Sequence, residues 1–136
     1  MAVPSLPPGG ERGPLVLIVD DSEKNLKLAR DVLRAGGFRT REAATGAQAI
    51  ALAAELLPDV ILIDLHLPDM DGTDAARRLG DDARTRRIPV VALSALPLDR
   101  GGDWATAAGF AGYLEKPISV RDLPQQVRAF CRGGAC

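Results

Sequence analysis

A single α/β domain, in which helices cover both faces of a five-stranded parallel sheet, is the fold that the sequence predicts. Five mainly apolar segments alternate with five segments that have helical signals. Three of the apolar segments, LVLIVD, DVILID and IPVVALSA, are almost continuously apolar, which is typical of strands that are covered on both faces. The chain has 136 residues, a length that suits one domain with a sizeable core.

Five strands are expected, and their polarity separates the centre of the sheet from its edge. The second strand, FRTREA, is more polar than the first, and this suits a position at the edge of the sheet. The strands are expected at residues 15–20, 38–43, 59–64, 88–95 and 112–116.

A helix is expected after each strand. In the last helix, Leu123, Val127 and Phe130 lie on one apolar stripe. The fourth helix is poorly marked because it contains Gly101 and Gly102. The helices are expected from a cap at Asp21 or Ser22 to Gly36, from a cap at Thr45 to Pro58, at about 73–80, at about 100–108, and from Ser119 to about Phe130.

The composition excludes several classes of protein. Apolar residues make up 46% of the chain, charged residues 26%, and the net charge is −1, so the basic surface of a nucleic-acid-binding protein is missing. No apolar run approaches the ~18 residues that a membrane span needs. The N-terminus, MAVPSLPPGGERG, lacks the basic start and apolar core of a signal peptide. We therefore expect a cytoplasmic chain with no nucleic-acid partner and no membrane partner.

The two ends of the chain are expected to lie outside the folded core. Residues 1–14 are rich in proline and glycine and predict a flexible leader, residues 15–132 form the domain, and residues 133–136 form a short tail. The two cysteines, Cys131 and Cys136, are too few for a disulfide framework or a four-ligand metal site. We expect both to be free thiols.

Polar side chains stand at the carboxyl ends of four predicted strands. Asp20 and Asp21 end the first, Asp64 the third, Ser94 the fourth and Lys116 the fifth. Ligands of open parallel sheets bind at these ends. If the first and third strands are neighbours, three carboxylates meet, and a cation such as Mg²⁺ would relieve their repulsion. A carboxylate can also accept a phosphoryl group, whose oxygens the hydroxyl of Ser94 and the ammonium of Lys116 could bind.

Four motifs that contain these residues occur in order along residues 15–119: LVLIVDDSEKN, VILIDLHLPDMDG, PVVALSA and GYLEKPIS. Together they resemble the receiver domain of two-component response regulators, and most of all the single-domain receivers of bacterial cell-cycle phosphorelays. The resemblance implies a flavodoxin-like (βα)5 doubly wound fold with the strand order 2-1-3-4-5.

The resemblance also implies a role for each acidic residue. Asp64 would accept phosphate from a histidine kinase or a histidine phosphotransfer protein. Asp20, Asp21 and Asp64, together with the backbone carbonyl of His66, would hold Mg²⁺ or Mn²⁺. The side chain of His66 has a simpler interpretation as an exposed loop residue.

A switch follows from the same resemblance. Ser94 and Lys116 would bind the phosphoryl oxygens, and Tyr113 would turn inward as Ser94 moves, although Tyr113 could equally be a packing residue. The Lys116–Pro117 peptide bond would be cis. A downstream protein would read the face formed by the fourth helix, the fifth strand and the fifth helix. The chain would be a monomer or a weak, phosphorylation-dependent dimer.

Two alternatives remain open from the sequence. The chain could be a receiver fragment of a larger hybrid kinase or regulator rather than a stand-alone regulator. It could also be an enzyme, because DMDGT at 69–73 matches the DxDGT motif of haloacid-dehalogenase-type phosphatases, with Asp69 and Asp71 as the reacting acids. In that family the first aspartate ends a strand, whereas here the strand is expected to end at Asp64. We therefore expect that the chain is not an enzyme but a signalling domain, which only gains and loses a phosphoryl group of its own.

Overall fold

The computed structural model describes residues 13–95, 105 and 107–131. Residues 1–12 of the predicted leader, the predicted tail, and most of the fourth helix expected at about 100–108 lie outside these residues. Ala105 and Ala107, which are described, are helical. The elements are β1 Leu15–Val19, α1 Glu23–Ala35, β2 Arg39–Ala43, α2 Gly46–Leu56, β3 Val60–Asp64, α3 Gly72–Asp81, β4 Val90–Ser94, β5 Gly112–Glu115 and α5 Leu123–Phe130.

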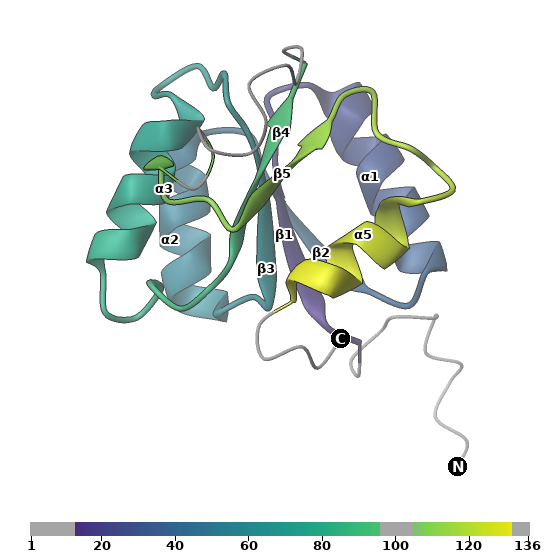
Figure 1. Cartoon of the computed structure of the whole chain (residues 1–136), viewed down its shortest axis with the longest axis horizontal. Helices are drawn as coiled ribbons and strands as arrows, with labels where there is room; N and C mark the ends of the chain where they lie inside the picture. Colours follow the sequence, from purple (N-terminus) through teal and green to yellow (C-terminus); the bar gives the residue numbers. More distant parts are fainter. Residues whose placement is uncertain (1–12, 96–104, 106, 132–136) are drawn as a thin grey trace.

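The five strands form one parallel sheet in the order β2-β1-β3-β4-β5, which confirms the order that the resemblance implies. Helices α2 and α3 cover one face, and α1 and α5 cover the other (Figure 1). The order reverses direction between β1 and β3, so the carboxyl ends of these two strands lie side by side.

The sheet divides the core into two layers because side chains alternate along each strand. Leu17 and Ile61 face the layer shared with α2 and α3, whereas Ile18 and Leu62 face the layer shared with α1 and α5. Every residue of β1, β3 and β4 is buried, which accounts for their unbroken apolar sequences. β2 has a mixed burial pattern and lies at the edge, as its polarity predicts.

Hydrogen bonds at the helix ends confirm some predicted boundaries and correct one. The hydroxyl of Ser22, rather than Asp21, caps α1 by accepting a bond from a backbone N–H of the first turn. Thr45 caps α2. The last helix begins at Leu123 and not at Ser119. Ser119 instead forms a turn in which its hydroxyl accepts a hydrogen bond from the N–H of Asp122 at 3.1 Å, and only then does the helix start.

The state of Cys131 differs from the expected free thiol. It is buried against the layer between the sheet, α1 and α5, and it is disulfide-bonded. The other cysteine of the sequence, Cys136, lies outside the described residues. α5 ends at Phe130, as expected, and the backbone of Cys131 is extended.

Among the described residues, no helix has both the length and the apolar character that a membrane crossing requires.

Candidate functional site

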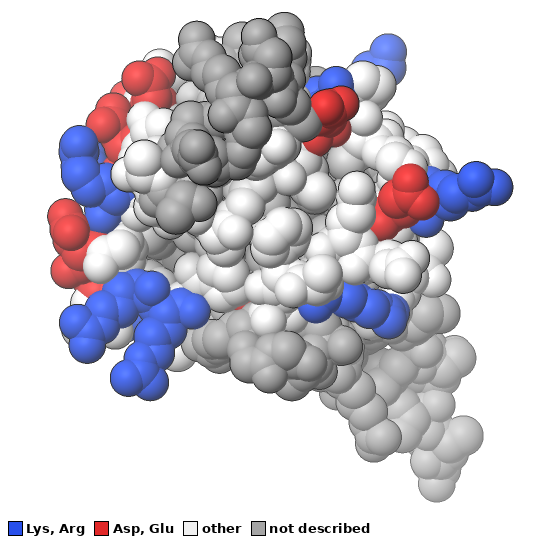
Figure 2. All heavy atoms as spheres, in the orientation of Figure 1, with Lys and Arg blue, Asp and Glu red and all other residues white. Residues whose placement is uncertain are grey.

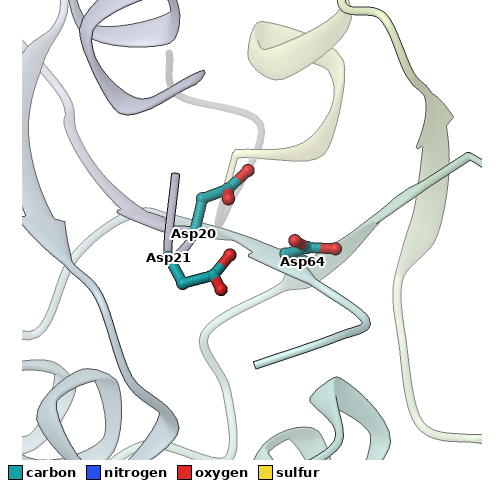
Figure 3. A group of neighbouring side chains, drawn as sticks. All are labelled: Asp20, Asp21 and Asp64. Carbon is teal, nitrogen blue, oxygen red and sulfur yellow. The ribbon is translucent and has the colours of Figure 1, made fainter. Parts of the chain in front are cut away.

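Three carboxylates meet at the carboxyl edge of the sheet. Asp20 directly follows β1 and Asp64 is the last residue of β3, and the residues before them, Val19 and Ile63, are register partners in the two strands. Asp21 follows Asp20. The side chains of the three acids lie side by side at the ends of β1 and β3 (Figure 3), and each offers an oxygen within 4.8 Å of the others. The strand order therefore assembles the acidic group that the sequence predicts.

Asp20 is the most buried member of this group, with 1% of its surface exposed. Its Oδ1 accepts a hydrogen bond from the N–H of Ser22 at 2.9 Å. Its Oδ2 accepts bonds from the side-chain amide of Asn25 at 3.2 Å and from the ammonium of Lys116 at 3.1 Å. Three donors thus compensate for the water that this buried carboxylate has lost.

Lys116 links two of the acids by charge. Its Nζ lies 3.1 Å from Oδ2 of Asp20 and 3.1 Å from Oδ2 of Asp64, and its side chain is 19% exposed. Partial burial alone would lower the pKa of Lys116, but hydrogen bonds and ionic attraction from Asp64 and Asp20 outweigh burial and raise it. The ammonium is therefore the counter-charge of the acidic group.

Ser94 and Lys116 are held side by side by the pairing of β4 with β5. Ser94 ends β4, is buried and is the register partner of Glu115. Its carbonyl accepts a hydrogen bond from the N–H of Lys116 at 2.8 Å. The Lys116–Pro117 peptide bond is cis, as the resemblance implies. These contacts bring the hydroxyl-bearing residue to the same edge of the sheet as the acids.

His66 and Tyr113 lie at the border of the site. The side chain of His66 is exposed, as its interpretation as a loop residue predicts, and its backbone N–H donates to Oδ1 of Asp64 at 3.3 Å. Tyr113 is half-buried in β5 and packs against the layer that contains α2 and α3. It is the register partner of Ala92, two residues before Ser94.

The structure does not support Asp69 and Asp71 as the reacting acids of a phosphatase. Both oxygens of Asp69 accept hydrogen bonds from the first two N–H groups of α2, from Gly46 at 2.8 Å and from Ala47 at 2.9 Å. These bonds lower the pKa of Asp69. Asp71 precedes α3, and neither residue ends a strand. The acid at a strand end is Asp64.

Sequence reasoning missed two contacts of the site. It did not assign Asn25 as a partner of Asp20, although a residue in the first turn of α1 stands close to the end of β1. It also did not foresee the bonds between Asp69 and α2, which join residues more than twenty positions apart. Helix N-termini attract carboxylates, but the sequence does not reveal which carboxylate reaches which helix.

The donors at the site fit a hard divalent cation. Asp20, Asp21 and Asp64 supply carboxylate oxygens, the ligand type that Mg²⁺ and Mn²⁺ prefer, and their spacing allows one ion to contact all three. A cation there would add to the positive charge of Lys116 and offset the repulsion among the acids.

A family model described as the response regulator receiver domain matches residues 16–128. The chain belongs to this family, so it is a signalling domain of two-component systems and not a conventional enzyme. The sheet order and the acidic group at the carboxyl ends of β1 and β3 agree with that assignment.

Individual relatives agree with the family match. The polar-differentiation response regulator DivK of Brucella ovis is 36% identical over 115 residues, which are 85% of this chain and 94% of the relative. The receiver domain of the sensor histidine kinase PA1611 from Pseudomonas aeruginosa, described with a magnesium ion coordinated in its active-site cleft, is 32% identical with a TM-score of 0.77 over 87% of this chain and 97% of the neighbour.

A third similar structure contains a signalling partner. It is a complex from Saccharomyces cerevisiae of the histidine phosphotransfer protein Ypd1 with the receiver domain of the response regulator Ssk1. The similarity has a TM-score of 0.79 and 25% identity, and it covers 87% of this chain and 88% of the neighbour.

Proposed function

We propose that this chain is a stand-alone receiver in which Asp64 accepts a phosphoryl group from a histidine kinase or a histidine phosphotransfer protein. The carrying observation is the position of Asp64 at the end of β3, within 4.8 Å of two further acids and 3.1 Å from the ammonium of Lys116. Its side chain is 12% exposed, so a donor can approach it while most of the carboxylate remains enclosed.

The proposed reaction transfers a phosphoryl group between two side chains. A carboxylate oxygen of Asp64 attacks the phosphorus of a phosphohistidine, the phosphorus–nitrogen bond breaks, and its electron pair leaves with the imidazole. Asp64 then carries an acyl phosphate. Attack by water on that phosphorus later releases inorganic phosphate and restores the carboxylate. The chain's chemistry is confined to these two steps.

Mg²⁺ or Mn²⁺ is the proposed cofactor. Asp20, Asp21 and Asp64 would hold it together with the backbone carbonyl of His66. When bound, the cation supplies positive charge that offsets the charge gathered on the acids and on the phosphoryl oxygens. The three-carboxylate group of this structure supports the proposal, as does the magnesium ion described for the Pseudomonas aeruginosa neighbour.

The remaining site residues would turn phosphorylation into a change of surface. A phosphoryl group adds about −1.5 to −2 charges and three acceptor oxygens, to which Lys116 and the hydroxyl of Ser94 would move. Because β4 and β5 are paired, a shift of Ser94 would alter the surroundings of Tyr113, which would turn inward. The active arrangement would already be populated to a small extent before phosphorylation.

Two surfaces are candidates for protein partners. For the phosphodonor, an apolar cavity of about 280 Å³ adjoins the site, with Leu28, Pro117 and Ile118 in its wall beside Asp20 and Lys116. An apolar side chain of the donor would fit there and bring its histidine to Asp64. The similar receiver Ssk1, solved with the phosphotransfer protein Ypd1, supports a partner of this class.

A downstream protein would bind the face formed by the fourth helix, β5 and α5. A depression on this face is lined by Tyr113, Glu115 and Gln126. The centre of the view that contains β5 is mainly uncharged, and charged side chains lie around its edges (Figure 2). The proposal includes a cytoplasmic location and a monomer or a weak, phosphorylation-dependent dimer. The chain matches 94% of the length of DivK, as is expected for a stand-alone receiver.

The test is phosphorylation by acetyl phosphate and Mg²⁺, followed by the intact mass of the protein. We expect one phosphoryl adduct on the wild type and none on Asp64→Asn, while Asp81→Asn, a change of an exposed acid in α3, still gains the adduct. An adduct that persists in Asp64→Asn would mean that a residue other than Asp64 accepts the phosphoryl group. A wild type that gains no adduct would contradict the proposal.

A further inference from the structure

The segment that follows the proposed phosphoryl acceptor is tightly held at its base. This segment, residues 65–71, is named the β3–α3 loop here. His66 and Asp71 form an isolated antiparallel bridge across it, and the N–H of Gly72 donates to the carbonyl of Leu65 at 2.8 Å. A Cβ atom at Gly72 would lie 2.6 Å from the carbonyl oxygen of Asp64, so a glycine is needed for this close approach. The base of the loop is therefore closed on itself, and its position relative to α2 depends on other contacts.

The tip of the loop is attached to a different helix. Oδ1 and Oδ2 of Asp69 accept hydrogen bonds from the N–H groups of Gly46 and Ala47, the first two residues of α2, at 2.8 and 2.9 Å. These N–H groups have no partner within the helix, and the positive end of the helix dipole favours a carboxylate. Asp69 thus uses both of its oxygens to join the loop to α2.

Packing supports the same attachment. A Cβ atom at Gly46 would lie 2.5 Å from Cγ and Sδ of Met70, so the side chain after Asp69 lies directly on the start of α2. The helix is itself a firm support, since Ala49 and Ala53 are fully buried against the sheet. The tip of the β3–α3 loop is therefore fixed to a rigid element by two hydrogen bonds and one apolar contact.

Helix α2 also has a cap that does not involve Asp69. The hydroxyl of Thr45 accepts a hydrogen bond from the N–H of Gln48 at 3.1 Å, and the side-chain oxygen of Gln48 accepts one from the N–H of Ala44 at 2.9 Å. The hydroxyl of Thr45 thus serves the N–H of Gln48, whereas the N–H groups of Gly46 and Ala47 bond to Asp69. Both sets of bonds lie at one helix end, so a substitution of Thr45 measures what a lost hydrogen bond there does to α2 alone.

We propose that Asp69 is a positioning residue for the metal site, which holds the β3–α3 loop against α2 so that the backbone of His66 keeps its place beside Asp64. The inference rests on the proposed use of Asp64 and the carbonyl of His66 as metal ligands. A ligand set binds a cation with an apparent affinity that falls in proportion to the fraction of molecules in the competent arrangement. Loss of the attachment therefore weakens Mg²⁺ binding and leaves the transfer step itself intact.

The experiment compares the wild type with Asp69→Ala, Asp69→Asn and Thr45→Ala. Calorimetric titration gives the Mg²⁺ affinity of each unphosphorylated protein, and phosphorylation by acetyl phosphate at several Mg²⁺ concentrations gives the half-saturating concentration and the maximal rate. Thr45→Ala is the matched control, because it removes one hydrogen bond at the same helix N-terminus without touching the loop.

Asp69→Ala is expected to raise the half-saturating Mg²⁺ concentration roughly three- to tenfold. This is at or below the loss of metal affinity that follows when a hydrogen-bond partner of a metal ligand is removed. Its maximal rate at saturating Mg²⁺ should stay within about twofold of the wild type, as follows when only the competent fraction changes. Asp69→Asn keeps one acceptor oxygen, so its value should lie between the two. Thr45→Ala should bind Mg²⁺ like the wild type.

Two outcomes would overturn the inference while the proposed function stands. In the first, the wild type is phosphorylated and Asp69→Ala has the same Mg²⁺ affinity as the wild type. In the second, Asp69→Ala and Thr45→Ala raise the half-saturating Mg²⁺ concentration equally. The second would mean that Asp69 acts through the stability of α2. A wild type that binds Mg²⁺ but gains no phosphate would contradict the proposed function alone, because calorimetry would still report the effect of Asp69.

Discussion

Replacing Lys116 by methionine should destabilise the protein when no divalent cation is present. The Nζ atom makes charge-assisted bonds to Asp20 and Asp64, each at 3.1 Å. One such bond contributes about 1.5–3 kcal/mol to stability. The substitution also removes an unfavourable contribution, because methionine has no ammonium to desolvate, and the Lys116 side chain is only 19% exposed. We expect the free energy of unfolding to fall by about 2–3 kcal/mol at neutral pH, because three neighbouring acids lose their counter-charge.

Urea denaturation followed by circular dichroism measures this loss, with and without Mg²⁺. Lys27→Met is the matched control, since its ion pair with Asp31 is 68% and 53% exposed and should contribute much less to stability. Added Mg²⁺ should stabilise Lys116→Met more than the wild type, because the cation replaces the missing ammonium. Two results would refute the view that Lys116 balances the acidic group. One is a loss of unfolding free energy in Lys116→Met no larger than that in Lys27→Met. The other is a difference in stability between Lys116→Met and the wild type that Mg²⁺ leaves unchanged.

Three further outcomes are expected. Ser94→Ala should still gain a phosphoryl adduct, but roughly tenfold more slowly because one donor to the phosphoryl oxygens is lost; a time course of intact mass measures this. Leu57 has a φ of 49° and is 45% exposed, so Leu57→Gly should raise the free energy of unfolding by about 0.5–1 kcal/mol in urea denaturation. Hydrogen bonds from Gly46 and Ala47 lower the pKa of Asp69 in the folded protein, so its stabilising effect is present at neutral pH and is lost as the pH falls below about 4. The stability of Asp69→Asn should accordingly vary less with pH in that range, and equal acid profiles would contradict this cause.

Much of the fold could be predicted because local patterns carry it. The unbroken apolar run of β3 indicates a strand covered on both faces, and all five of its residues are buried. The start of α5 could not be predicted in the same way. Ser119 is a good helix cap by type, but its hydroxyl serves a turn, and the helix begins only at Leu123. Residue type alone does not distinguish these two uses of a serine.

Contacts between distant segments were less predictable. The spacing of residues places Asp20 and Asp64 at strand ends, and the resemblance supplies the strand order that makes them neighbours. Neither indicates that Asn25 completes the surroundings of Asp20 or that Asp69 reaches the start of α2. Such partners depend on how helices sit on the sheet, and that arrangement follows from packing over the whole domain.

Local patterns in the sequence predict which segments form strands and helices, and they predict an acid, a hydroxyl and an ammonium at the ends of different strands. That Lys116 lies between Asp20 and Asp64, although it is 96 positions from Asp20, follows only from the folded arrangement of the chain. The difference lies in the range over which the interactions act. Hydrophobic periodicity and helix caps act within a few residues, whereas the meeting of charged side chains depends on strand register and on the crossovers that bring β1, β3 and β5 into one sheet.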